Sequence, residues 1–381
     1  YLSDYHDLDV ELDWINSGNV STAQGKLYFA GQFYNDEAGT TEARLYAADP
    51  TTGEVTEIPM TPLNSDDNSS ENLQAVTVSP DGSSYWTIID RYVFTNYEDD
   101  TTVAFNAEAG GEEAITEEAA GEEAAGEEAA GEEAPAEEAP AEEAAGDEAP
   151  AEEAEAPIDD TAEAEASTTE EPAIDEGYTE GNNQETYTAY KYDMSGNQLL
   201  EIDLTEIVSA DQDWFYPQYV AQDGEGNLYI AGDSKIYCFG ADGSEKEHIA
   251  MDNQWIMNLV STGDGTVVAE YFADGEGTPT LCKVENGKLG DAITITGDGE
   301  SGSMNFFSGS GNTLMASDGN YLYSVDIGTG VSTKLLSWLD SDINASNLTG
   351  VAAAGDDQIL VLCNRFSMKG NNTFEMGTLT K

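Results

Sequence analysis

Three tryptophans occupy positions where aromatic side chains could hold a ligand. Trp14, Trp214 and Trp255 each come shortly before a stretch that resembles an innermost strand, and carboxylates and amides flank them. Aromatic rings stack on sugars and cover apolar side chains, while the flanking groups can hydrogen-bond to hydroxyls or peptides. Packing between neighbouring sheets is the favoured interpretation of this pattern, and a carbohydrate- or peptide-binding surface is the alternative. The candidate contact residues are Trp14, Trp214, Phe215, Tyr216, Trp255, Asn305 and Phe306.

Catalytic chemistry finds little support in the sequence. The two histidines, His6 and His248, are not in a metal-binding spacing, and both are expected to be exposed. The glycine-rich segment 297–302 lacks the lysine of a phosphate-binding loop. We therefore predict no catalytic residue and no cofactor, and we favour a non-enzymatic protein. The alternative is a hydrolase or lyase that acts on a carbohydrate or lactone through carboxylates at a central opening.

One acidic segment resembles part of a calcium loop. Asp340, Asp342 and Asn344 place oxygen ligands at alternate positions, as such a loop does. A calcium loop also needs glycine at its sixth position and glutamate at its twelfth, where this chain has Ala345 and Val351. An acidic turn between two repeats is therefore the favoured interpretation, and calcium binding is the weaker one.

A short pattern recurs along the chain and marks turns between strands. In this pattern a Gly/Asp turn precedes an apolar strand, as in Asp223–Gly226 before Leu228–Ile230. Glycine after Asp or Asn supplies the positive φ that tight hairpins need. Turns near residues 226, 265, 311 and 356 are spaced 39, 46 and 45 residues apart. This period suits a four-stranded repeat of roughly 40 to 50 residues.

The repeats predict an all-β protein, a β-propeller built of four-stranded blades. Six blades account for the repeats, with seven as the alternative if one repeat has diverged too far to recognise. The third strand predicted for the last blade, Thr373–Leu379, reaches the end of the sequence, so that blade lacks its outermost strand. Asp7–Leu12 alternates Asp and apolar residues like a half-exposed strand. We therefore expect the N-terminal strand to complete the last blade and close the ring.

Residues 107–185 differ from the repeats in composition. They hold 30 acidic residues and no Lys or Arg, in runs such as Gly-Glu-Glu-Ala-Ala and Ala-Glu-Glu-Ala-Pro. Like charges repel at every helical turn and prolines interrupt any long helix, so we expect a disordered acidic insertion. It divides the second blade between its second and third strands. The predicted organisation is propeller over 1–106, insertion over 107–185 and propeller again over 186–381.

The charge of the chain excludes two classes of partner. The formal net charge is −65, and the residues outside 107–185 still carry 47 acids against 12 basic residues, a charge of −35. Binding to nucleic acid or to an anionic membrane needs Lys and Arg to neutralise phosphate, so neither partner is expected. No run approaches the roughly 20 apolar residues of a membrane helix. Cys238, Cys282 and Cys363 fall within predicted strands and are expected to be buried and unpaired.

One stretch resembles a known propeller repeat. Residues 45–55, Leu-Tyr-Ala-Ala-Asp-Pro-Thr-Thr-Gly-Glu-Val, resemble the repeat of propellers related to pyrroloquinoline-quinone enzymes, and 322–330 repeats the pattern. The usual Trp after the glycine is absent, with Val55 and Thr56 following instead. The resemblance therefore implies a propeller strand and turn, and it carries over no quinone-binding residue.

The chain as a whole is similar to the N-terminal propeller of extracellular solute-binding lipoproteins of gut Firmicutes. The similarity rests on Tyr1-Leu2, Gly25–Phe29, Leu335–Ile343 and Leu379–Lys381. It implies a lipid-anchored module at the cell surface, next to a solute-binding domain that holds the ligand of an importer. We therefore expect a non-enzymatic, extracytoplasmic propeller that binds a carbohydrate or peptide, or acts as a scaffold for the neighbouring domain.

Overall fold

The chain divides into two compact units, and the structure describes most of one of them. The computed structural model has one unit formed by Tyr1–Tyr97 with Gly181–Lys381 and a second formed by Glu98–Glu180. The described residues are 2–380 except 9, 11, 16–18, 37, 50–51, 67, 94–183, 210–214, 216, 218, 233–234, 252–253, 274–278, 286, 300–303, 339–347, 354–357 and 367–371. All structural statements below concern the first unit.

The described residues form six small sheets and one short helix, α1 (Thr205–Ser209). Sheet 1 contains β2 (Val20–Ala23), β3 (Lys26–Asn35), β4 (Thr40–Ala48) and β5 (Val55–Ile58). Sheet 2 contains β6 (Ser65–Asp66), β7 (Ser69–Val78), β8 (Ser84–Val93), β9 (Gln184–Asp193) and β10 (Gln198–Asp203). Sheet 3 contains β11 (Val220–Gln222), β12 (Leu228–Ala231), β13 (Lys235–Phe239) and β14 (Ile249–Ala250).

The second half of the chain supplies the other three sheets. Sheet 4 contains β15 (Gln254–Ser261), β16 (Val267–Ala273), β17 (Thr280–Glu285) and β18 (Lys288–Ala292). Sheet 5 contains β19 (Thr296–Gly297), β20 (Asn305–Ser308), β21 (Thr313–Ser317), β22 (Tyr321–Asp326) and β23 (Val331–Ser337). Sheet 6 contains β24 (Leu348–Ala353), β25 (Gln358–Phe366), β26 (Asn372–Thr380) and, from the other end of the chain, β1 (Leu2–Leu8).

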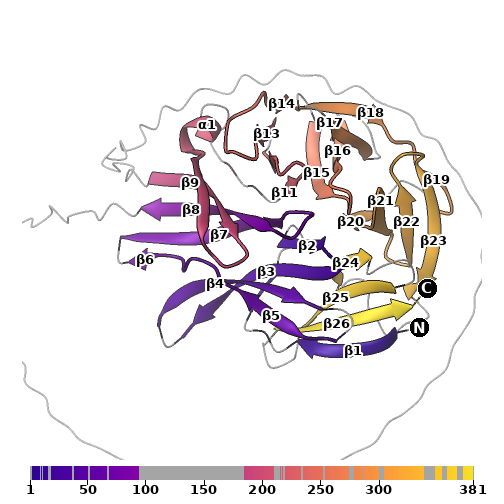
Figure 1. Ribbon diagram of the computed structural model, residues 1–381, viewed down its shortest axis with the longest axis horizontal. Helices are drawn as coiled ribbons and strands as arrows, with labels where there is room; N and C mark the ends of the chain where they lie inside the picture. The colour runs from indigo at the N-terminus through magenta and orange to yellow at the C-terminus, as the bar shows by residue number, and fades with distance from the viewer. Residues whose placement is uncertain are drawn as a thin grey trace, which may run out of the picture. The chain divides into compact units, whose positions relative to one another are not determined.

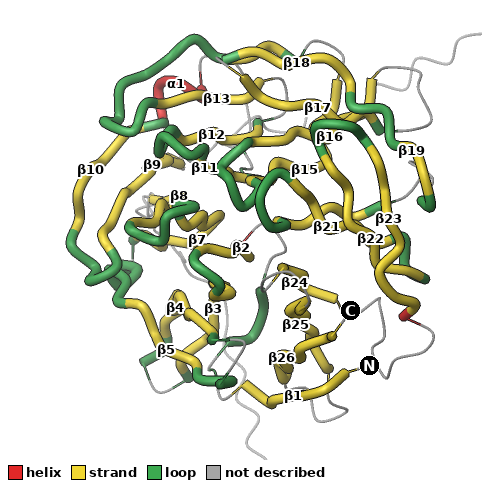
Figure 2. Tube along the Cα trace, turned by 45° about the vertical axis from the view of Figure 1, so that its right-hand side comes forward, coloured by secondary structure: helices red, strands yellow, loops and turns green. Residues whose placement is uncertain are grey.

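The sheets are arranged around a common centre, each with one strand innermost (Figure 1). The innermost strands β2, β7, β11, β15, β20 and β24 contact one another in this order, and β24 also contacts β2. Figure 2 shows the sheets standing around this centre with β5, β10, β18 and β23 toward the outside. The predicted all-β propeller is confirmed; four of the described sheets have four strands, and sheets 2 and 5 each have a fifth, two-residue strand, β6 and β19.

Alternation of side chains along each strand explains how the sheets pack on one another. On β12, Leu228 and Ile230 join the core shared with sheet 2, while Tyr229 and Ala231 join the core shared with sheet 4. Successive side chains of a strand point to opposite faces, so one strand serves two interfaces. This is why β12 is apolar at every position rather than at alternate ones.

The N-terminal strand lies on the outer edge of the last sheet. β1 pairs antiparallel with β26, from Leu2 opposite Leu379 to Leu8 opposite Phe374. The pairing of the two ends was predicted, but the strand is Leu2–Leu8 rather than Asp7–Leu12. Leu12 instead turns inward and is buried in the core between sheets 1 and 6.

Sheet 2 is built from two segments that lie far apart in the chain. β8 pairs with β9 from Ser84 opposite Asp193 to Val93 opposite Gln184. The two strands are neighbours in the sheet although residues 94–183 separate them in the chain. Those residues lie outside the described part, so their predicted disorder stays a prediction.

Cysteine and histidine positions give one confirmation and one correction. The three cysteines are buried, as predicted, and none is in a disulfide. His248 was expected to be exposed, but only 14 % of its side chain is accessible. Its Nδ1 accepts a hydrogen bond from the Cys238 amide at 3.1 Å, and its ring packs edge-on against Tyr237. The side chain of His6 lies outside the described residues.

Candidate functional site at the centre of the sheets

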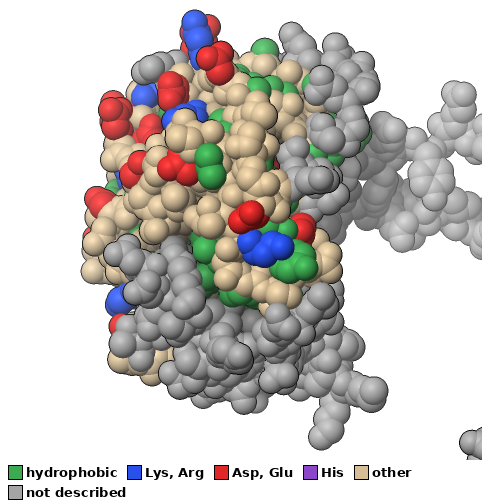
Figure 3. Space-filling model, turned by 90° about the vertical axis from the view of Figure 1, so that its right-hand side faces the viewer, with side chains coloured by type: hydrophobic (Ala, Val, Ile, Leu, Met, Phe, Trp, Pro, Cys, Tyr) green, Lys and Arg blue, Asp and Glu red, His purple; other side chains and the backbone are tan. Residues whose placement is uncertain are grey.

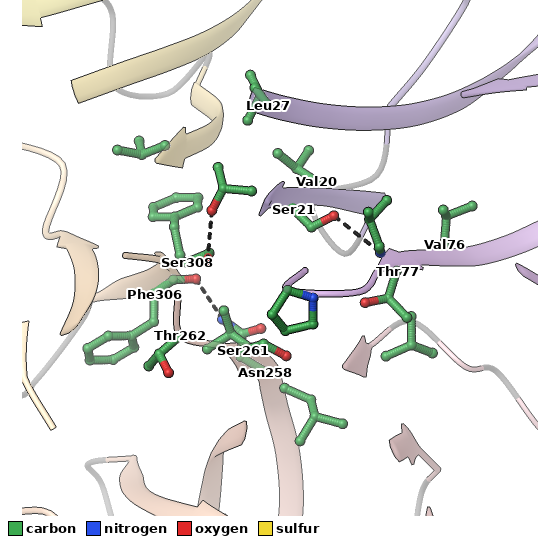
Figure 4. Close-up of a pocket in the computed structure, with 18 residues that line it drawn as sticks. Val20, Ser21, Leu27, Val76, Thr77, Asn258, Ser261, Thr262, Phe306 and Ser308 are labelled. Atoms are coloured by element: carbon green, nitrogen blue, oxygen red, sulfur yellow. Dashed lines mark hydrogen bonds between the residues drawn. The ribbon is translucent and has the colours of Figure 1, made fainter. Parts of the chain in front are cut away.

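The innermost strands enclose a small cavity at the centre of the sheets (Figure 4). Its volume is about 50 Å³. That is room for roughly three to five water molecules, at about 10–15 Å³ for each. The lining residues come from all six sheets; the polar ones are Ser21, Thr22, Thr77, Asn258, Ser261, Thr262 and Ser308.

The lining of this cavity is polar but uncharged. Among the described residues that line it, none is an acid, a base, a histidine or a cysteine. The remaining lining side chains are apolar, such as Val76, Val220 and Phe306. The cavity as described therefore offers hydroxyl and amide hydrogen bonds, and its lining holds no general acid or base.

Much of this hydrogen-bonding capacity joins one sheet to another. Asn258 Nδ2 donates to the Phe306 carbonyl at 2.9 Å, and Thr22 Oγ1 donates to Ser308 Oγ at 3.0 Å; both bonds are drawn in Figure 4. Ser261 Oγ donates to the Gln222 carbonyl at 2.6 Å, and Gln222 Nε2 donates to a sheet 2 carbonyl. These groups stabilise the centre of the propeller, and a larger ligand would have to bind at one of its ends.

The turns after the innermost strands gather at one end of the unit. Gly224 N donates to the Gly265 carbonyl at 2.9 Å, and Asp264 N donates to the Gly311 carbonyl at 2.9 Å. These bonds join the turns of sheets 3, 4 and 5. The innermost strands therefore begin at the opposite end, which we call the strand-start face.

Two of the predicted aromatic residues are exposed on the strand-start face. Trp14 continues the line of β2, since its backbone bridges to Gln32 of β3, and it is 40 % exposed. Trp255 is the second residue of β15 and is 76 % exposed. Met257, two residues further along the same strand, is 42 % exposed. Asn305, the first residue of β20, is also exposed. These three candidate residues are accessible to a ligand.

The other described candidates are buried in the cores. Phe215 is 3 % exposed, and its ring packs edge-on against Tyr187 at 5.1 Å and Tyr237 at 5.6 Å. Phe306 is 6 % exposed and packs in the core of sheets 4 and 5, where its side chain also lines the central cavity. Their positions are those of packing residues. Trp214, Tyr216 and the calcium candidates Asp340, Asp342 and Asn344 lie outside the described residues.

Many of the described aspartates hold turns together. Hydrogen bonds from Ser79 and Ser83 lower the pKa of Asp81. Hydrogen bonds from Asn197 and Ser244 lower the pKa of Asp193 and Asp242, respectively. An aspartate that accepts bonds from the residues that follow it closes a turn locally. The abundance of aspartate thus reflects the number of turns.

Two buried carboxyls behave differently. Burial raises the pKa of Glu270 to about 7. Burial also raises the pKa of Asp90, although hydrogen bonds from Gln74 and Asn72 oppose the shift. Glu270 lies on β16 and Asp90 on β8, in sheets that are not neighbours, and neither lines the central cavity. They are two separate buried acids.

Neither a metal-binding cluster nor a membrane-spanning helix occurs among the described residues. There, no group of three or more His, Cys, Asp or Glu is arranged to hold a metal ion. None of the described helices has the length and apolar character needed to cross a membrane. On the face shown in Figure 3, acidic and basic side chains are scattered over the described surface rather than gathered into one patch.

Comparisons with known proteins extend the description of the fold. No protein-family model matches the chain, and no curated protein is significantly similar to it. Among solved structures, a protein of unknown function from Dyadobacter fermentans aligns with a TM-score of 0.50 and 9 % identity, over 100 % of this chain and 98 % of that one. The fold is a β-propeller.

Two enzymes show weaker likenesses. An oligogalacturonate lyase in complex with manganese aligns with a TM-score of 0.40 and 11 % identity, over 95 % of this chain and 77 % of that one. Prolyl oligopeptidase B from Galerina marginata aligns with a TM-score of 0.42 and 10 % identity, over 99 % of this chain and 42 % of that one. The chain therefore spans less than half the length of that peptidase. Likenesses at this level of identity concern the fold alone.

The sequence also held a signal for the cavity that our predictions did not use. Thr22, Ser79, Thr262 and Ser308 each stand three residues before a turn glycine. Thr22, Thr262 and Ser308 line the cavity, whereas Ser79 holds its own turn. A hydroxyl residue at this fixed offset would have pointed to the polar centre.

Proposed function

We propose that this chain is a non-enzymatic binding propeller that holds a carbohydrate or a peptide on its strand-start face. The observation that carries the proposal is the exposure of Trp255, at 76 %, on a rigid innermost strand. Aromatic side chains bury roughly 150–250 Å² each when they are covered, and area of this size contributes on the order of a few kcal/mol. A ligand that covers this ring would gain that energy.

Other exposed residues on the strand-start face suit the same role. Met257 extends the apolar surface along β15, and Trp14 supplies a second ring from sheet 1. Asn305 adds an amide that can hydrogen-bond to a hydroxyl or a peptide group. An aromatic platform with polar groups beside it is the usual composition of a site for sugars or peptide side chains.

We place this function outside the cytoplasm, in a surface lipoprotein of an import system. The support is the similarity to propellers of solute-binding lipoproteins of gut Firmicutes. In that setting the partner on the strand-start face is either a free ligand or the adjacent solute-binding domain. A hydrolase or lyase acting on carbohydrate or lactone is the second candidate; Glu270, whose pKa burial raises to about 7, is the carboxyl to test for it, although it does not line the central cavity.

A thermal-shift screen of the full chain against oligosaccharides, peptides and calcium tests the proposal. A ligand that binds only the native state raises Tm, and replacing both Trp14 and Trp255 with Ala should weaken that binding by about tenfold or more. Both rings are exposed, so the free energy of unfolding of the variant should lie within about 1 kcal/mol of that of the parent.

The matched control is Leu199→Ala, which removes a side chain of comparable exposure, 51 %, from the outermost strand β10. It should bind like the parent. A ligand bound equally well by the double variant would contradict the proposed site. Turnover of a saccharide or lactone in the same incubations, lost in Glu270→Gln, would favour the enzyme instead.

A further inference from the structure

A second pocket lies on the side of sheet 2 that faces sheet 1, away from the central cavity. Its floor is formed by strands β7 to β10 and its wall by residues 60–64, which connect sheet 1 to sheet 2. Its volume is about 170 Å³, room for a molecule of a few non-hydrogen atoms. We call it the side pocket.

Two cross-strand rows build the floor of the side pocket. Thr87, Tyr190 and Glu201 are paired in register across β8, β9 and β10. Tyr192 stands two residues from Tyr190, opposite Gln198. Paired residues of antiparallel strands project to the same face, as do residues two apart on one strand. The two tyrosines, Thr87 and Glu201 therefore converge on one surface.

The aromatic part of the floor is held in place by its neighbours. The rings of Tyr190 and Tyr192 are 6.2 Å apart and inclined by 38°. Tyr192 is also stacked on Tyr85 at 5.2 Å, and Thr61 from the wall hydrogen-bonds to its hydroxyl. The rings thus present a pre-formed surface.

Two carboxylates flank these rings. Asn64 N donates to Glu71 Oε2 at 2.8 Å, which fixes Glu71 against the wall. Gln198 Nε2 donates to Glu201 Oε2 at 3.1 Å. Burial first, and then the charges of Glu201 and Glu71, raise the pKa of Tyr190. Among the described residues that line the pocket, none is Lys, Arg or His.

A buried hydroxyl in the same pocket lacks a partner. Thr87 is 2 % exposed, and its Oγ1 makes no hydrogen bond to any described residue. Buried side-chain hydroxyls are bonded in the large majority of cases, so an unbonded one that lines a cavity indicates a place for a ligand or a water. Thr87 Oγ1 and the two carboxylates offer oxygen acceptors around one aromatic surface.

We propose that the side pocket binds a small organic cation of the alkylammonium class. The ammonium donates its three hydrogens to oxygen acceptors such as those of Glu71, Glu201 and Thr87, and its alkyl chain covers the tyrosine rings. A neutral sugar would leave two carboxylates uncompensated. The site is separate from the strand-start face, so a test of this proposal does not decide the proposed function.

Titration of the full chain with n-butylammonium chloride, followed by amide chemical shifts in NMR, tests this proposal. The expected result is saturable shifts in β8, β9 and β10, with a Kd in the millimolar range because so few atoms make contact. 1-Butanol, which has the same chain length and no charge, should bind at least about tenfold more weakly. Raising the salt concentration should weaken the ammonium binding.

Three variants separate a specific site from general attraction to an acidic protein. Glu201→Gln and Tyr190→Leu should each weaken butylammonium binding several-fold. Glu206→Gln removes the same charge from an exposed position on α1 and should leave the affinity unchanged. The proposal is wrong if butanol binds as well as the cation, if glucose alone saturates the pocket, if Glu206→Gln and Glu201→Gln behave alike, or if no shift saturates.

Discussion

Glu270 shows what burial alone does to a side chain. It is 6 % exposed, no hydrogen bond or cation from a described residue stabilises its charged form, and burial raises its pKa from 4.5 to about 7. The unfolded chain loses this proton near pH 4.5, whereas the folded protein keeps it until about pH 7. The favourable contribution of the neutral carboxyl is therefore complete below pH 4.5 and is lost as the pH rises to about 7.

Replacing Glu270 with Gln should remove this pH dependence. Relative to the parent, the variant should gain on the order of 3 kcal/mol in the free energy of unfolding between pH 4.5 and pH 8, because Gln has no proton to lose. Urea unfolding of both proteins at pH 4.5, 6 and 8 measures the difference. A constant difference across these pH values would contradict the prediction, and Glu206→Gln, at an exposed position on α1, provides the baseline.

The sequence did not predict which individual aromatic side chains are exposed. The offset of a tryptophan from an innermost strand placed Trp255 correctly at the start of β15, and its side chain is exposed. The same reasoning grouped Phe215 and Phe306 with it, although both are buried. Residue type and offset do not distinguish the two cases, because exposure depends on which neighbouring sheet covers the ring. The side pocket escaped notice for a similar reason, since its residues meet only through strand pairing.

At the scale of the element, turns were the most predictable feature. Asp223 accepts bonds from the amides of Glu225 and Asn227, and Gly226 has a φ of +86°. Side-chain capping and positive φ are local properties, so they are legible in sequence. The exact limits of β1 and the two-residue strands β6 and β19 were not predicted, because they depend on pairing with distant segments.

One turn glycine has a second role that sequence does not reveal. A Cβ at Gly265 would lie 2.4 Å from the Gly224 backbone of the neighbouring sheet, and the residue has a φ of +83°. At Gly25 the φ is similar, +74°, but a Cβ would meet nothing within 4 Å. The pair separates the cost of backbone conformation from the cost of close contact between sheets.

Gly265→Ala should therefore destabilise the protein more than Gly25→Ala. We expect about 1–2 kcal/mol for Gly25→Ala, from the left-handed conformation alone, and at least about 2 kcal/mol more for Gly265→Ala, because two backbones must move apart. Chemical denaturation of the two variants gives both values. Equal losses would mean that sheets 3 and 4 separate at little cost.

At the scale of the whole molecule, the sheets form a closed series of neighbours that uses both ends of the described chain. β1 covers β26, which would otherwise be the free edge of sheet 6. An unpaired edge exposes backbone donors and acceptors that can pair with another molecule. The N-terminal strand thus stabilises the sheet and protects it from association.

Deleting residues 1–8 should lower Tm and cause concentration-dependent association. A synthetic peptide of the same eight residues should restore both properties in part, because it can add to the sheet as a strand. Differential scanning calorimetry and light scattering measure the two effects. An unchanged Tm in the truncated protein, with or without the peptide, would show that pairing with β1 does not stabilise sheet 6.

The pairing of β1 with β26 also fixes an order of events during synthesis. Leu2 leaves the ribosome before the rest of the propeller, whereas its partner Leu379 is made only after it. At typical translation rates this interval is on the order of tens of seconds, during which sheets 1 to 5 can assemble while the first strand has no partner. The acidic residues Asp4 and Asp7 in that strand would keep it from joining other nascent chains in the meantime. Pairing of β1 with β26 is then the last step of folding, and a chain whose translation stops before β26 cannot complete it.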